Sequence, residues 1–349
     1  MFNVLEKSLP ELVELESLIA KMGDKGRVRV IAEIPYEDQV FPIHAIEIGS
    51  EDPTTPCFAM VGGVHGLERI GSLVVNSTLQ TVLELLSWDQ TLKERLKHSR
   101  LLFVPILNPV GMYRRSRSNG NNVDLMRNAP VFSEEATRFL YGGHRVSPKI
   151  PFYRGALADG MEKENQALTD LLVERLLPAD VSICLDVHSG FGSSDRLWFP
   201  YARTQKPFPY FVEAYAFREL LNKTYPHHVY SVEPQSIQYT THGDLWDYLY
   251  DIHLQKKKGK EFFLPLTLEL GSWKWVRKNP RQIFDVIGVF NPILPHRKAR
   301  VLRDQKTFMD FLHRAVMTRG WIDLTPEQRQ IWKFEALNHW YADIHNEAS

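Results

Sequence analysis

The chain has few cysteines and no long hydrophobic run. Only two of its 349 residues are cysteine, Cys57 and Cys184, and both stand in apolar segments. Cysteines in such segments usually pack as small hydrophobic residues, so we expect no disulfide framework. No stretch reaches the roughly 18 apolar residues of a membrane-spanning helix. Acidic residues interrupt the leucines of residues 1–22, so we expect no signal-peptide core there. These absences favour a cytoplasmic protein that does not act at a membrane.

The chain also lacks an excess of charge of either sign. Its 42 Lys and Arg residues balance 42 Asp and Glu residues. No overall field would therefore attract nucleic acid or an anionic membrane surface. Hydrophobic residues make up 44% of the chain, which is enough for a sizeable buried core. The expected partner is a small molecule or a peptide.

Apolar periodicity predicts alternating strands and helices. The runs typical of strands are residues 27–34, 43–48, 57–61, 101–107, 181–187 and 264–270. The helical patterns are residues 10–22, 70–88, 89–98, 161–177, 243–253, 304–319 and 326–341. The last four strands are apolar enough to be buried on both faces, and strand–helix–strand order favours parallel crossovers. This pattern predicts a single α/β domain over residues 1–349, with a core at about 25–320 and terminal helices packed on it.

A glycine-rich turn follows the strand at residues 57–61. Residues 62–68 read GGVHGLE, and ligands of open α/β sheets bind beyond the carboxyl ends of strands. A spacing of three lets His65 and Glu68 point the same way, and imidazole and carboxylate are good zinc donors. The alternative is a helix N-terminus at which Glu68 only favours the dipole. A catalytic zinc site needs a third protein ligand.

Two later strands supply further candidates. His188 ends an apolar strand in the segment CLDVHSG, and Glu269 lies inside one in LTLELG. An ionised Glu is rarely buried unpaired, so we predict that Glu269 faces a metal site as a general base. His188 is the predicted third metal ligand. The structural alternatives are a hydrogen-bonded histidine at a strand end and a buried Glu–Arg ion pair.

The most irregular tract, residues 110–154, is rich in Gly, Asn, Pro, Ser and Arg. Loops of this length inside a compact domain are usually functional. Arg114, Arg117 and Arg127 could match a carboxylate or polarise a carbonyl oxygen, although loop arginines are also commonly solvated. Asp124 could hold a metal-bound imidazole in the correct tautomer.

Three motifs occur in a fixed order: H-x-x-E after Gly-Gly, a distant D-x-H-S and a late T-x-E-L. This ordered set resembles the M14 metallocarboxypeptidase superfamily, which includes aspartoacylase-like deacylases. The resemblance spans about residues 56–272. It implies a mixed, largely parallel twisted sheet with helices on both faces. It also implies one Zn²⁺ per chain, held by His65, Glu68 and His188, with Glu269 as the base.

The resemblance further assigns Arg117 to the scissile carbonyl, Arg127 to the terminal carboxylate of the substrate, and Tyr239 to a mobile substrate-side tyrosine. Arg114 is a further predicted substrate-binding residue, and Asp124 is predicted to support the metal ligands. Met126 stands where the family has an asparagine beside the carboxylate-binding arginine.

Three functions follow as expectations. The first is a zinc metallopeptidase that acts on a short peptide. The second is a deacylase of an N-acyl amino acid, which Met126 makes more plausible. The third is a non-catalytic, zinc-stabilised peptide-binding protein, against which the intact Glu269 argues.

Overall fold

The computed structural model describes residues 7–342, and its centre is one eight-stranded sheet in the order β1-β2-β4-β3-β5-β8-β6-β7. The strands are β1 (Arg27–Tyr36), β2 (Gln39–Gly49), β3 (Cys57–Gly62), β4 (Arg100–Val104), β5 (Val181–Ser189), β6 (Arg196–Phe199), β7 (Ser231–Pro234) and β8 (Phe262–Leu270). β3 pairs in parallel with β4 and β5, as do β5 with β8 and β6 with β7. The other pairs are antiparallel. The predicted mixed, largely parallel α/β sheet is confirmed.

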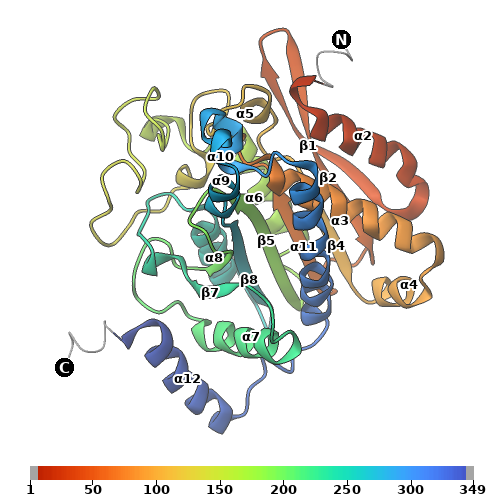
Figure 1. Ribbon diagram of the computed structural model, residues 1–349. Helices are drawn as coiled ribbons and strands as arrows, with labels where there is room; N and C mark the ends of the chain where they lie inside the picture. The colour runs from red at the N-terminus through yellow and green to blue at the C-terminus, as the bar shows by residue number, and fades with distance from the viewer. Residues whose placement is uncertain (1–6, 343–349) are drawn as a thin grey trace.

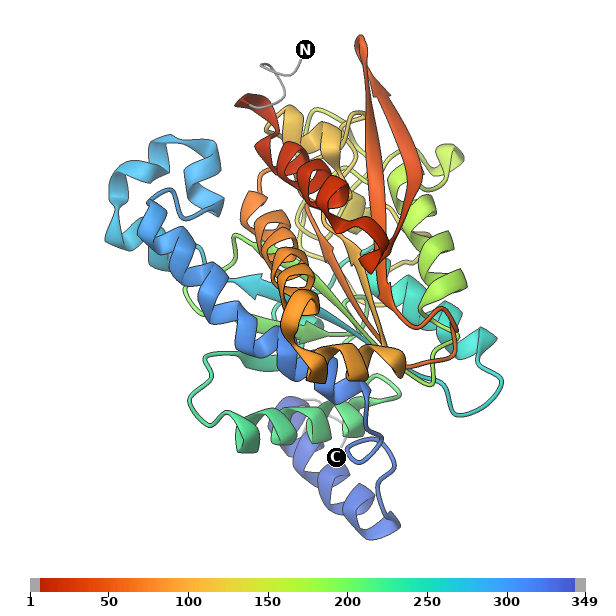
Figure 2. The same cartoon turned by 90° about the vertical axis from the view of Figure 1, so that its right-hand side faces the viewer.

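Helices cover both faces of this sheet. They are α2 (Pro10–Met22), α3 (Arg69–Trp88), α4 (Gln90–Lys97), α5 (Pro109–Tyr113), α6 (Lys163–Arg175), α7 (Phe211–Thr224), α8 (Leu245–Lys256), α9 (Trp273–Lys278), α10 (Val286–Phe290), α11 (Pro295–Val316) and α12 (Pro326–Trp340). In Figures 1 and 2, α2, α3 and α11 lie on one face, and α6 and α8 lie on the other. Within the described part of the chain, no helix has the length and apolar composition to cross a bilayer.

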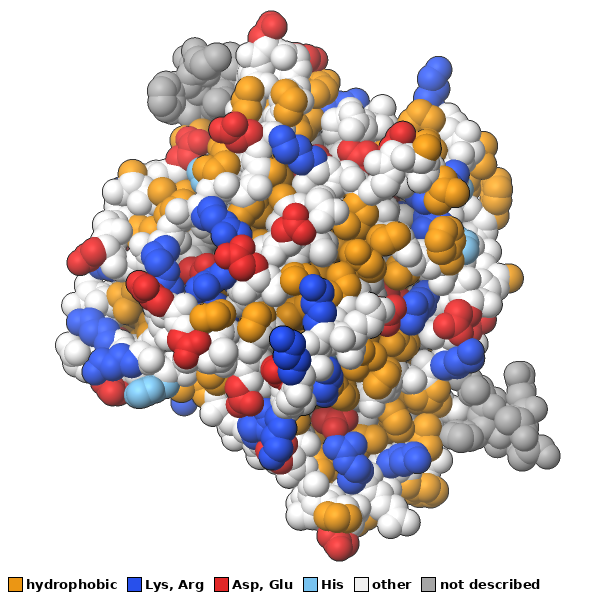
Figure 3. Space-filling view, turned by 180° about the vertical axis from the view of Figure 1, so that it is seen from behind, with side chains coloured by type: hydrophobic (Ala, Val, Ile, Leu, Met, Phe, Trp, Pro, Cys, Tyr) orange, Lys and Arg blue, Asp and Glu red, His pale blue; other side chains and the backbone are white. Residues whose placement is uncertain are grey.

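The central strands explain why the sheet needs two helical layers. Every residue of β3, β4, β5 and β8 is buried. Near-continuous apolar strands of this kind are stable only between two covering layers. Cys57 and Cys184 are buried in β3 and β5 as free thiols, as the sequence predicts. On the rear face, Figure 3 shows basic and acidic side chains intermixed with groups of hydrophobic ones.

Several elements were not predicted from the sequence. β6 and β7 have four residues each, too few to show a period. In α7 the buried positions are consecutive, from Val212 to Phe217, so its pattern does not mark one helical face. The predicted strand at 101–107 also ends earlier, at Val104. Asp244, in contrast, caps α8 by accepting hydrogen bonds from the backbone N–H groups of Trp246 and Asp247, and this cap fixes where α8 begins.

The packing of α11 makes stability depend on pH. His313 is buried there and contacts the Ser99 hydroxyl at 2.9 Å. Burial, with a contribution from Arg95, lowers the pKa of His313 to about 3. An unfolded histidine has a pKa of about 6.5, so the neutral ring stabilises the fold above that pH. This stability is lost as the pH falls toward the folded pKa.

We therefore expect the free energy of unfolding to fall between pH 7 and pH 5, with His313 accounting for about 2 kcal/mol. Urea denaturation at both pH values measures the change. A His313→Gln variant should lose this part of the pH dependence. The matched variant His98→Gln, at an exposed position, should keep it. Equal pH dependence in both variants would contradict the assignment.

Candidate metal centre and active site

The candidate metal ligands come from the carboxyl ends of two neighbouring strands. His65 and Glu68 lie in the turn between β3 and α3, and His188 lies near the end of β5. The turn is tight because Gly66 packs against the backbone of Gly111, where an added Cβ would lie 2.0 Å from a backbone carbon. Only glycine fits there, which is why this segment presents both donors to the same point.

His65, Glu68 and His188 form a buried cluster, each only 3% to 4% exposed. His65 Nδ1 lies 2.8 Å from Glu68 Oε1, and His188 Nδ1 lies 3.0 Å from Glu68 Oε2. The two Nδ1 atoms are 3.2 Å apart. One donor atom from each residue lies within 4.8 Å of the others. Two nitrogens and a carboxylate oxygen are the ligands of a catalytic zinc site that keeps one position open.

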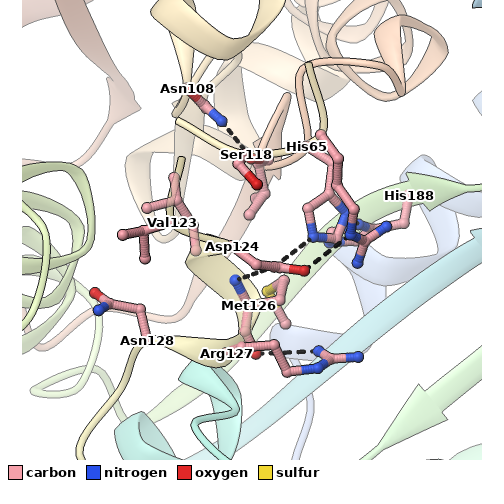
Figure 4. A network of polar contacts seen from close by, with 12 residues as sticks. His65, Asn108, Ser118, Val123, Asp124, Met126, Arg127, Asn128 and His188 are labelled. Carbon is pink, nitrogen blue, oxygen red and sulfur yellow. Dashed lines mark hydrogen bonds and ion pairs between the residues drawn. The ribbon is translucent and has the colours of Figure 1, made fainter. Parts of the chain in front are cut away.

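The second nitrogen of each imidazole faces a carboxylate. His65 Nε2 lies 3.0 Å from Asp124 Oδ1 (Figure 4), and His188 Nε2 lies 2.5 Å from Asp186 Oδ2. Trp246 at the start of α8 donates its indole N–H to the same Asp186 oxygen at 2.9 Å. A proton on each Nε2 leaves the Nδ1 lone pairs directed at one point. The residues present therefore fit a divalent metal ion.

The electrostatics of the cluster favour a cation. Burial opposes ionisation of Glu68, but His65 and His188 outweigh it and hold the pKa of Glu68 well below its usual range. Burial likewise lowers the pKa of His188, but Asp186 and Glu68 raise it well above its usual value. The anionic groups thus create a negative potential at the point where the donors converge.

Glu269 lies beside this cluster on β8, directly opposite His188 in the strand register. Its Oε1 accepts a hydrogen bond from the Phe191 backbone N–H at 3.0 Å. Burial and the nearby Glu68 raise the pKa of Glu269 to about 8. Within residues 7–342 the buried Glu269 carboxylate forms no ion pair with an arginine, so the alternative of a buried Glu–Arg ion pair is wrong.

The cluster opens into a cavity of about 700 Å³. Its lining includes the four residues above together with Arg117, Met126, Arg127, Arg138, Tyr141, Phe152, Phe191, Trp198, Gln235, Tyr239, Thr267 and Phe290. Arg117 donates to Asp124 at 2.8 Å and to Glu68 at 3.3 Å. The irregular tract thus forms part of the cavity wall.

Arg127 enters the cavity because Asp124 caps the short 3₁₀ helix at Leu125–Arg127. Its guanidinium donates to the carbonyls of Tyr141 at 3.2 Å and Met126 at 3.1 Å, and lies 5.9 Å from the ring of Tyr239. Figure 4 shows Met126 between Asp124 and Arg127. Tyr239 therefore lines the cavity beside Arg127.

Arg114 is not part of this site, contrary to the sequence prediction. Its guanidinium donates to the carbonyls of Asn119 and Gly120 and to the Asn122 side chain, at 3.1 to 3.2 Å. It also stacks over Tyr36 and does not line the cavity. Arg114 instead closes its own loop, because two backbone carbonyls and one side-chain oxygen within eight residues accept hydrogen bonds from it.

Two site residues were missed or left unassigned by the sequence reasoning. Asp186 precedes His188 by two positions on the same face of β5, and this D-x-H spacing was the available signal. Arg138 also lines the cavity. It lies in the irregular tract, where no periodicity or motif indicates which side chains turn inward.

The fold and this donor set are those of an α/β metallopeptidase. Residues 39–271 match the model of peptidase M14, the zinc carboxypeptidases, and the chain belongs to that family. Family membership implies a bound metal, typically zinc.

Individual relatives are more distant. Carboxypeptidase SOL1 of Arabidopsis thaliana is 33% identical over 129 residues, which are 36% of this chain and 24% of that protein. The match thus spans about a quarter of that relative. Bovine thrombin-activatable fibrinolysis inhibitor, solved with tick carboxypeptidase inhibitor, is similar with a TM-score of 0.62 and 18% identity, over 90% of this chain and 97% of that one. Carboxypeptidase A of Helicoverpa armigera is similar with a TM-score of 0.60 and 16% identity, over 88% of this chain and 71% of that one. These structures share the fold.

Proposed function

We propose that the protein is a zinc-dependent carboxypeptidase that hydrolyses the last amide bond of a short peptide. The observation that carries this proposal is the convergence of His65, Glu68 and His188 beside Glu269, in a cavity that also contains Arg127. Zinc held by the first three residues would act as a Lewis acid toward water and the scissile carbonyl.

The other residues have roles that their positions support. Glu269 accepts a proton from the attacking water and passes it to the leaving amine. Arg117 is held by Asp124 and Glu68 through Nε and Nη1, which leaves Nη2 for the oxyanion of the transition state. Arg127 binds the terminal carboxylate, and Tyr239 packs beside it.

A second candidate is the deacylase of an N-acyl amino acid. It is favoured by Met126, which places a thioether in the cavity wall where the family has an amide donor. The same base and the same metal ligands would serve this reaction, because both substrates present an amide next to a free carboxylate. The two functions therefore differ in the acyl side of the substrate.

The experiment compares zinc-loaded protein on peptides with free and amidated C-termini and on N-acyl amino acids. We expect kcat/KM to favour the free carboxylate by about 10- to 100-fold, the value of one charge-assisted hydrogen-bonded contact. Arg127→Gln should remove this preference, and Arg114→Gln should preserve it. Faster hydrolysis of N-acyl amino acids would favour the deacylase. Peptide binding without any turnover would favour a binding protein.

A further inference from the structure

Four arginines come from the loops at residues 127–154, and two of them, Arg127 and Arg138, line the cavity. The residues concerned are Arg127, Arg138, Arg145 and Arg154, in the yellow to green loops of Figure 1. Among the described residues, none of these four forms an ion pair, whereas Arg117 forms two. The neighbouring acid Glu134 is paired with Lys206 instead.

The buried members of this group lie close together. Arg127 and Arg154 are both 3% exposed, and an added Cβ on Gly143 would lie 3.0 to 3.1 Å from both side chains. Arg154 donates to the carbonyls of Arg127 and Val131. Burial and the charges of Arg145 and Arg127 lower the pKa of Arg154 to about 10. Grouping like charges away from water costs stability, and an anion bound nearby would recover it.

Arg138 is the member whose donors are free. It is exposed, it lines the cavity, and its side chain makes no hydrogen bond within residues 7–342. It begins the turn at residues 138–142, in which the Tyr141 carbonyl accepts from Arg127 Nε. The turn therefore links Arg138 to Arg127, and both arginines line the same cavity without an ion pair among the described residues.

We propose that the substrate carries a second carboxylate, on the side chain of its C-terminal residue, and that Arg138 binds it while Arg127 holds the terminal carboxylate. This inference rests on the proposed function. A basic side chain finds no partner, because the carboxylates that line the cavity, Glu68 and Glu269, belong to the metal centre and the base. A planar guanidinium matches a carboxylate with two parallel hydrogen bonds, which a neutral amide cannot reproduce.

The test compares N-benzoyl-Gly-Glu with its isostere N-benzoyl-Gly-Gln as substrates of the zinc-loaded protein. We expect kcat/KM to be at least about 10-fold higher for the glutamate substrate. Arg138→Gln should bring the ratio close to one, and Arg138→Lys should restore part of it. The matched control Lys149→Gln removes an exposed positive charge from the same loop and should leave the ratio unchanged. Equal rates for both substrates, or an equal loss on both in Arg138→Gln, would overturn the proposal.

A binding measurement separates this proposal from the proposed function. Calorimetry with free glutamate and free glutamine, the two products, requires no turnover. Tighter binding of glutamate by about 10-fold, lost in Arg138→Gln, would support the second carboxylate site even if neither substrate were hydrolysed. Equal binding of the two amino acids would overturn it.

Discussion

Replacing Glu269 by Gln is expected to lower kcat by about 10²- to 10⁴-fold, the usual contribution of a general base. The amide has nearly the same shape and can still accept from the Phe191 N–H, but it cannot take a proton from water. The metal ligands are not changed by this substitution, so zinc should remain bound. Initial rates and zinc content, measured on the same preparation, check both parts of the expectation.

Glu164→Gln is the matched control. Glu164 is also a buried carboxylate, and burial raises its pKa to about 6, but it lies outside the cavity and accepts from Asn119. This variant should keep nearly full activity. A near-normal rate for Glu269→Gln would show that another group takes the proton, and the proposed mechanism would then be wrong.

The second large effect is expected on metal binding. His65→Ala and His188→Ala each remove one of three protein donors, and zinc content should fall from about one per chain to a small fraction of that. Elemental analysis after dialysis measures it. His44→Ala, at a histidine of β2 outside the cluster, should retain the metal. Zinc retained in both ligand variants, or no zinc in the unchanged protein, would contradict the site.

Substitution of the two carboxylates that contact the imidazole Nε2 atoms should have smaller effects on zinc binding. Asp124→Asn and Asp186→Asn keep the size of the side chain but weaken its hold on the imidazole Nε2–H. We expect each to weaken zinc affinity by about 10- to 100-fold, as measured by competition with a chelator. An effect of Asp186→Asn as large as that of His188→Ala would mean that Asp186 itself is a ligand.

Much of the fold and of the candidate site could be predicted because the signals are local. The apolar runs that became β3, β5 and β8 need burial on both faces, and this need follows from their composition alone. Parallel strands place their carboxyl ends at one edge of the sheet. Residues at the carboxyl ends of such strands or just beyond them, such as His188 and His65, are therefore brought together without any knowledge of the loops.

The sequence by itself determined the central strands of the sheet, the donor types and their order along the chain, because periodicity and spacing act over a few residues. Only the tertiary structure decided which loop side chains reach the cavity. It turned Arg114 onto its own loop, placed Arg138 in the wall, and brought Trp246 from α8 to Asp186. Irregular loops set the positions of these side chains. Because such loops have no periodic pattern, the sequence does not indicate which way their side chains point.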